Sequence, residues 1–221
     1  MFYKRLFPNV LIQGASPNFF RGLQRRVMAV LWLERAPCDT YLDLILVPSD
    51  QMQSINQLTR GHCKPTDALT FSEVNETNQS INNILFSCTN DVLEQNDDSD
   101  LTSSPVLFYP PSTKTDHLPT RRALRSELVD LGKIYICVEY IWRRAMRLPL
   151  KNLPLELYLE AVLVHALLHG LGYTHETEEA LWRMIRRERR IGYHLRSLQR
   201  KYPLDMPPMD VVEYMKMILR K

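Results

Sequence analysis

The chain has 221 residues, of which 45% are hydrophobic and 24% are charged, and its formal net charge is +3. This length allows one domain with a sizeable core plus extensions. No apolar run approaches the roughly 20 residues of a membrane-spanning helix, because the richest stretch, 153–171, contains Glu156, Glu160 and His165. The net charge is too small to indicate a nucleic-acid partner by itself, so its distribution has to be considered.

The amino-terminal segment is basic. Its first 33 residues contain five Lys or Arg and no acidic residue before Glu34, which is the charge bias of an organelle-targeting segment. We therefore expect a mitochondrial location, with the cytoplasm as the alternative. The same residues are equally compatible with a strand at Val10–Gln13 and an amphipathic helix from about Pro17, with its arginines on the solvent face.

Periodicity predicts the first half of the fold. Leu23, Val27, Val30 and Leu31 recur at helical spacing, whereas YLDLILV at 41–47 is a β-type run. The segment 60–72 contains Gly61 and Pro65, which are typical of a loop. The elements predicted here are a helix at 18–35, a strand at 41–47, a helix at 51–59 and a short strand at 68–71.

A polar segment then interrupts the pattern. From about residue 75 to 126 the sequence is rich in Asn, Ser, Asp, Thr and Pro, so it cannot supply a continuous core and is predicted to be an insertion that is largely loop. The elements predicted after it are a strand at 131–138, helices at 139–147, from Pro154 to about 171 and at 178–191, and a last helix at 209–219.

Three histidines lie close together in the sequence. His165 and His169 are four residues apart on one predicted helix, so both imidazoles leave the same face. Such a pair alone is also common among core and surface histidines. Gly170 and Gly172 let the chain turn, however, and return His175 to the open side of the pair. Three neutral imidazoles with a vacant fourth position are typical of catalytic zinc, so we predict one Zn²⁺ per chain.

The spacing of these histidines is also that of metzincin proteases, so peptide hydrolysis is an alternative. In those enzymes a glutamate beside the first histidine is the general base, whereas this chain has Ala166 there. Glu176 or Glu178 could replace it only if the fold brings one of them back to the metal. A protease is therefore disfavoured.

Three segments resemble a known family. VHALLHGLGYTHE at 164–176 resembles the signature H-G-x-L-H-L-x-G-Y-D-H of the YbeY endoribonucleases. RGHCKPTDALTF at 60–71 resembles their R-x-x-D-x-x-T-D-V-L-S-F segment, and LGKIYICV at 131–138 their L-G-D-I-x-I-S strand. The resemblance covers about 8–74 and 127–191. It implies an α+β fold with a small mixed β-sheet covered by helices, a three-histidine zinc site, and a role in rRNA processing and small-subunit quality control.

The resemblance also implies roles for single residues. The three histidines take the zinc-ligand positions, and Arg60 takes that of the cleft arginine; a zinc ion and a guanidinium suit phosphodiester cleavage. Lys133 and Thr174 replace two aspartates of the family pattern, and loss of a supporting carboxylate could lower metal affinity or activity roughly 10- to 100-fold. Lys133 could instead bind phosphate. The alternative function is therefore an assembly factor that binds the immature small subunit without cleaving RNA.

The segment 183–201 is strongly basic, with Glu188 as its one acid. Such a stripe gives sequence-independent, salt-sensitive affinity for RNA, and a solvated helix face is the alternative interpretation. Tyr193, Tyr202 and His194 could stack on bases but are more often packing residues. The candidate RNA-binding residues are Arg183, Arg186, Arg187, Arg190 and Lys133.

These interpretations combine into one hypothesis. We expect an α+β metal-dependent hydrolase domain at 1–191, with a zincin-like metal-site helix, and a basic helical extension at 192–221. It is expected to be an endoribonuclease of rRNA maturation, with rRNA or a small-subunit assembly intermediate as partner. The cysteines form no C-x-x-C pair and are predicted to be reduced thiols, and His62 and His117 are predicted to be loop histidines.

Overall fold

The computed structural model describes residues 7–72, 85–87, 129–147 and 154–218. Most of the predicted insertion, together with Cys88 and His117, lies outside these ranges. The described cysteines, Cys38, Cys63 and Cys137, are free thiols, and His62 is exposed in the loop after α2, as predicted. None of the described helices combines the length and apolar composition that crossing a membrane requires.

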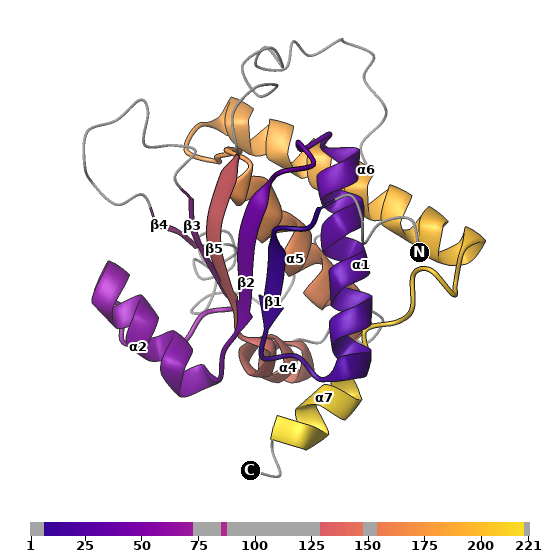
Figure 1. Cartoon of the computed structure of the whole chain (residues 1–221). Helices are drawn as coiled ribbons and strands as arrows, with labels where there is room; N and C mark the ends of the chain where they lie inside the picture. Colours follow the sequence, from indigo (N-terminus) through magenta and orange to yellow (C-terminus); the bar gives the residue numbers. More distant parts are fainter. Residues whose placement is uncertain (1–6, 73–84, 88–128, 148–153, 219–221) are drawn as a thin grey trace, which may run out of the picture.

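A mixed five-stranded sheet with the order β1-β2-β5-β3-β4 forms the centre of the fold (Figure 1). The neighbouring strands β1, β2 and β5 are parallel, and β3 runs antiparallel to β5 and β4. The predicted α+β architecture is confirmed. The strands are β1 (Val10–Gln13), β2 (Tyr41–Leu46), β3 (Ala68–Phe71), β4 (Leu85–Ser87) and β5 (Asp130–Ile136).

Helices cover both faces of this sheet. On one face α1 and α5 pack on the larger core, which includes Leu44 and Ile134. On the other face α2 packs against a smaller cluster around Met52 and Leu69 (Figure 1). The helices are α1 (Pro17–Leu33), α2 (Ser49–Arg60), α4 (Val138–Arg147), α5 (Leu155–Gly170), α6 (Glu178–Lys201) and α7 (Val211–Ile218).

One prediction about secondary structure was wrong, because helix α6 does not end at 191 but continues through Gly192 to Lys201. A glycine within a helix costs about 1 kcal/mol, and burial of Ile191 and Leu195 offsets that cost. Within the segment predicted to be largely loop, Leu85–Ser87 pairs antiparallel with β3; a three-residue strand that depends on tertiary pairing leaves no periodic signal.

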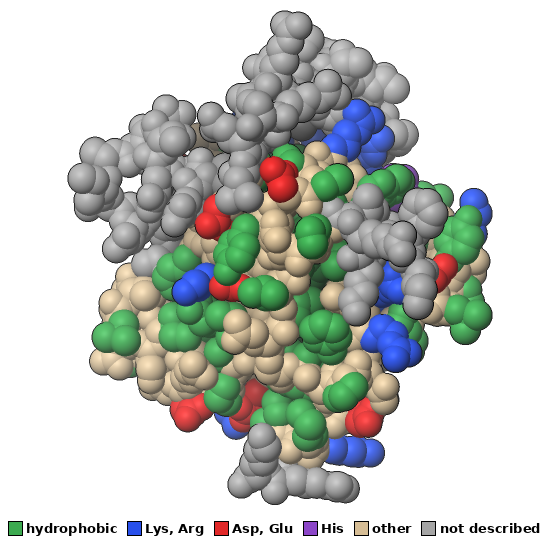
Figure 2. Space-filling view, in the orientation of Figure 1, with side chains coloured by type: hydrophobic (Ala, Val, Ile, Leu, Met, Phe, Trp, Pro, Cys, Tyr) green, Lys and Arg blue, Asp and Glu red, His purple; other side chains and the backbone are tan. Residues whose placement is uncertain are grey.

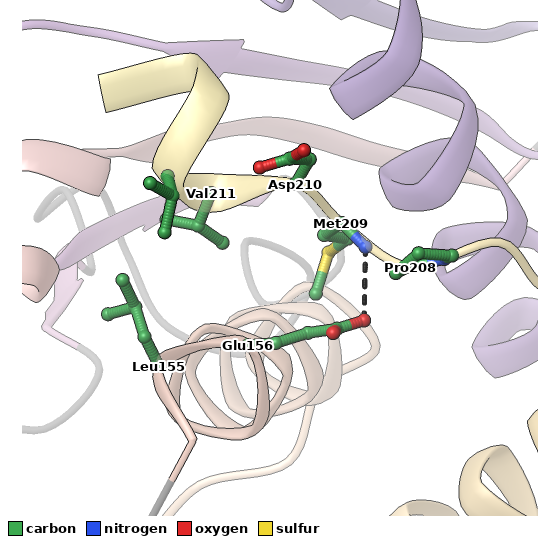
Figure 3. A pocket seen from close by; sticks show the side chains of 7 residues that line it. Leu155, Glu156, Pro208, Met209, Asp210 and Val211 are labelled. Atoms are coloured by element: carbon green, nitrogen blue, oxygen red, sulfur yellow. Dashed lines mark hydrogen bonds between the residues drawn. The ribbon is translucent and has the colours of Figure 1, made fainter. Parts of the chain in front are cut away.

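The carboxyl-terminal residues pack on the main core. Met209 and Tyr214 are buried in the cluster that contains α1 and α5. The backbone N–H of Met209 donates to Glu156 Oε1 over 3.0 Å, beside an open pocket at the start of α5 (Figure 3). A Cβ at Gly22 would lie 2.6 Å from the Pro208 carbonyl oxygen, which is a steric clash. The close packing of α1 on this segment therefore requires a glycine at position 22.

The arginines of α1 were expected on its solvent face, and for Arg26 this expectation was wrong. Arg26 is 0% exposed and is surrounded by acceptors. Its Nε and Nη2 donate to Glu160 and Glu156 over 2.9 and 2.6 Å, and its Nη1 donates to the carbonyls of Pro207 and Gly22. A buried guanidinium is tolerated when its donors are satisfied in this way. Arg26 therefore joins α1, α5 and the carboxyl-terminal segment.

Candidate metal centre

The three predicted histidines converge on one point. One ligand atom from each of His165, His169 and His175 lies within 4.8 Å of the others, and the Nε2 atoms of His165 and His169 are 3.2 Å apart. Nitrogen ligands of tetrahedral zinc are separated by about 3.3 Å, given a Zn–N distance of about 2.05 Å. The first two imidazoles are therefore already spaced as one ion requires.

The turn after α5 places the third ring. Gly170 is the last residue of the helix, and the chain reverses at Gly172, whose φ of +88° favours glycine. The ring of His175 then lies with its centroid 5.0 Å from that of His169 and 5.9 Å from that of His165. The predicted turn is confirmed, and Gly172 is the glycine whose backbone conformation makes it.

His169 is held in the neutral form and in one tautomer. Its Nδ1–H donates to the carbonyl of Tyr173 over 2.9 Å, which leaves Nε2 with a lone pair for a metal. The side chain is fully buried. Burial, followed by the charges of His165 and His175, lowers the pKa of His169 to about 3 although the Tyr173 carbonyl opposes the shift. No proton has to be displaced from His169 near neutral pH.

His165 is oriented by a carboxylate from another helix. Its Nδ1 contacts Oε1 of Glu188 in α6, so Nε2 again faces the other imidazoles. Metal-binding histidines commonly donate their second N–H to a carboxylate or a backbone carbonyl. The donor set of three imidazoles with two oriented rings therefore fits a divalent transition ion, and the three residues could hold one.

Comparisons with known proteins identify the family of this chain. The profile of the family described as "Endoribonuclease YbeY" matches residues 15–196. The chain belongs to the YbeY endoribonuclease family. The Endoribonuclease YbeY of Leptospira interrogans is 30% identical over 135 residues, which cover 61% of this chain and 72% of that protein. The solution structure of TM1509 from Thermotoga maritima shares 20% identity and has a TM-score of 0.43, covering 85% of this chain and 92% of that one.

The YbeY match includes α6 as far as residue 196, so Glu188 lies inside it. Arg60, the cleft residue implied by the resemblance, is the half-buried last residue of α2. Its positive charge is one of the causes that lower the pKa of His169. The structure thus brings Arg60 into the electrostatic environment of the histidines, although α2 and α5 lie on opposite faces of the sheet.

Lys133 is not placed with the histidines. It is exposed on β5, where side chains alternate between the two faces of the sheet. Its neighbour Ile134 faces the α5 side, whereas Tyr135 packs with the α2 side. Lys133 therefore lies on the face that α2 covers, away from α5.

The candidate RNA-binding arginines differ in their surroundings. Arg183, Arg186 and Arg190 are exposed on α6, and basic side chains are visible along the upper right edge of the molecule, where α6 lies (Figures 1 and 2). Arg187 is instead ion-paired with Glu34 and donates to the Leu33 carbonyl over 3.2 Å. It therefore has a structural contact that sequence periodicity does not reveal.

A buried acid near the metal centre was missed by sequence reasoning. Asp67 follows the loop after Arg60 and is 0% exposed. Its Oδ1 accepts from the Ala68 N–H over 2.9 Å, while its Oδ2 has no hydrogen-bond partner among the described residues. Burial raises the pKa of Asp67 to about 6, although the Ala68 N–H and the charges of Arg144 and His165 oppose the shift. The T-D pair of the family motif was the available signal.

The free energy of unfolding of metal-free Asp67→Asn, measured relative to that of the metal-free wild type, is expected to be larger at pH 7 than at pH 4. The folded state keeps the Asp67 proton up to about pH 6, whereas the unfolded chain releases it near pH 4. The wild-type free energy of unfolding therefore falls as pH rises from 4 to 6. Asparagine does not titrate, so urea unfolding should show a relative gain of roughly 3 kcal/mol for the variant. Exposed Asp39→Asn is the control, and a variant-minus-wild-type difference independent of pH would contradict the expectation.

Proposed function

We propose that this chain is a zinc-dependent endoribonuclease that acts in rRNA maturation and small ribosomal subunit assembly. The observation that carries the proposal is the convergence of His165, His169 and His175 in a chain that belongs to the YbeY endoribonuclease family. The relative from Leptospira interrogans carries the same description. A hydrolase acting on RNA phosphodiesters is the function that these observations support best.

Zinc is the ion that suits this donor set. Three imidazoles favour zinc over magnesium or calcium, which prefer oxygen ligands, and three protein ligands leave a position for water or substrate. Zinc would supply a Lewis acid for a phosphoryl oxygen and would lower the pKa of bound water to about 7. The neutral His169 and the carboxylate contact of His165 support this choice.

The protein's own charges would hold the RNA. Phosphodiester cleavage builds negative charge on the nonbridging oxygens. The Arg60 guanidinium can stabilise this charge with a bidentate pair of hydrogen bonds. Arg183, Arg186 and Arg190 on α6 offer exposed cations for flanking phosphates, and this contribution should weaken with salt. Glu188 lies on the same helix and contacts His165, so the basic helix and the metal centre adjoin.

The proposed setting is an immature small ribosomal subunit in the mitochondrion. The acid-free first 33 residues support this location over the cytoplasm. Arg21, Arg25 and Arg26 nevertheless belong to α1, so only Lys4 and Arg5 remain outside the described fold as a targeting charge. A large ribonucleoprotein is a partner to which an exposed basic helix can bind through backbone phosphates.

The proposal is tested by cleavage of single-stranded ribosomal RNA. Zinc-loaded wild type is expected to cut the RNA, chelator-treated protein to lose the activity, and added zinc to restore it. His169→Ala should be inactive, exposed His62→Ala should cut as wild type does, and Arg60→Ala should keep its zinc but cut more slowly. Identical gel patterns from wild type and His169→Ala would exclude the nuclease and favour a factor that binds the subunit without cleaving RNA.

A further inference from the structure

Glu34, just after α1, joins two elements that support the histidines. Its Oε2 accepts the hydroxyl of Tyr173 over 3.1 Å, and its Oε1 is ion-paired with Arg187 of α6. The Glu34 side chain is only 6% exposed, so solvent screens these contacts weakly. Removal of the carboxylate would leave a part-buried guanidinium and a hydroxyl without this acceptor.

Tyr173 transmits this contact to the metal centre. Its hydroxyl is bound to Glu34, while its backbone carbonyl accepts the Nδ1–H of His169 over 2.9 Å. Its N–H donates to the Leu168 carbonyl over 3.0 Å. Tyr173 is thus fixed at both ends, and the position of its carbonyl selects the tautomer of His169.

The same turn of α6 supports both oriented histidines. Glu188 contacts His165 directly, and the preceding residue, Arg187, reaches His169 through Glu34 and Tyr173. These contacts connect α1, the turn after α5, and α6. The geometry of the imidazoles therefore depends on a residue outside the histidine motif.

We propose that Glu34 is a positioning residue for metal binding, acting on His169 through Tyr173. The inference rests on the metal binding contained in the proposed function but not on RNA cleavage. Removal of groups that orient metal ligands typically weakens metal affinity 10- to 100-fold. Glu34 acts one contact further from the ion, so the effect should lie near the lower end of this range.

Co²⁺ binding to the full chain tests the proposal, because the visible absorption of bound Co²⁺ reports its ligand geometry. Glu34→Gln and Tyr173→Phe are expected to raise the Co²⁺ dissociation constant by about 10-fold and to alter the spectrum. Tyr193→Phe removes a hydroxyl from an exposed tyrosine and should change neither. Urea unfolding of each metal-free variant measures its folded fraction, and the Co²⁺ dissociation constants are calculated for the folded protein only.

A purely structural role for Glu34 would lower the stability of the metal-free protein while the folded fraction kept the wild-type affinity and spectrum; that result would overturn the inference. Wild type that binds no Co²⁺ would overturn it together with the metal-dependent part of the proposed function. Weakened binding in both variants would support it even if wild type cut no RNA, so the two failures are distinguishable.

Discussion

Glu188→Ala is expected to weaken zinc binding about 10- to 100-fold. The Glu188 carboxylate contacts Nδ1 of His165, and without it the ring is free to rotate or to carry its proton on Nε2, the atom that faces the other imidazoles. Zinc binding would then have to order the His165 ring, and this cost would weaken the affinity. Competition with a chromogenic chelator measures the affinity, which should fall while the stoichiometry at saturation stays at one.

Glu179→Ala is the matched control for Glu188. Glu179 is exposed in the first turn of the same helix, so its removal changes the net charge equally without touching a histidine. Glu188→Gln keeps an oxygen acceptor for His165 and should fall between wild type and the alanine variant. Equal zinc affinities for the two alanine variants would show that the Glu188 contact does not support the metal centre.

The histidine cluster could be predicted because its geometry is local. Residues four apart on one helix share a face, and the φ of Gly172 returns His175 to that face, so a short sequence encodes the whole ligand set. The burial of α1 and α5 was predictable for the same reason, since periodic apolar residues define each buried stripe. Local patterns therefore gave the elements and the ligands.

The supporting contacts could not be predicted, because they depend on how distant elements pack. In the sequence Glu188 is simply the one acid in a basic stripe, yet in the structure it contacts His165 from another helix. Glu34 marked only the end of an acid-free segment, and the structure places it against Tyr173 and Arg187. Lys133 and Thr174 replace two aspartates of the family pattern, so neither of those carboxylates is present to orient a histidine. Tertiary packing supplies the carboxylate of Glu188 from α6.

Arg26→Ala is expected to lower the free energy of unfolding by about 3–5 kcal/mol, the usual cost of breaking a buried ion pair from one side. The loss leaves Glu160, which is 3% exposed, without its cation. Burial raises the pKa of Glu160, and Arg26 opposes that shift, so the variant should have a still higher Glu160 pKa. The folded variant would then keep a proton that the unfolded chain releases near pH 4.5. The loss of unfolding free energy of Arg26→Ala relative to wild type should therefore grow as pH rises from about 5 to 7.

Urea unfolding at the two pH values measures this effect, with exposed Arg21→Ala as a control that should stay within about 0.5 kcal/mol of wild type. The double variant Arg26→Met, Glu160→Leu removes both buried charges and should recover much of the loss, since well-packed apolar replacements of buried pairs are often neutral. Glu156 has a side chain 27% exposed and can remain solvated when Arg26 is absent. If the double variant were no more stable than Arg26→Ala, the cost would come from the bonds to Pro207 and Gly22 and not from the unpaired Glu160 carboxylate.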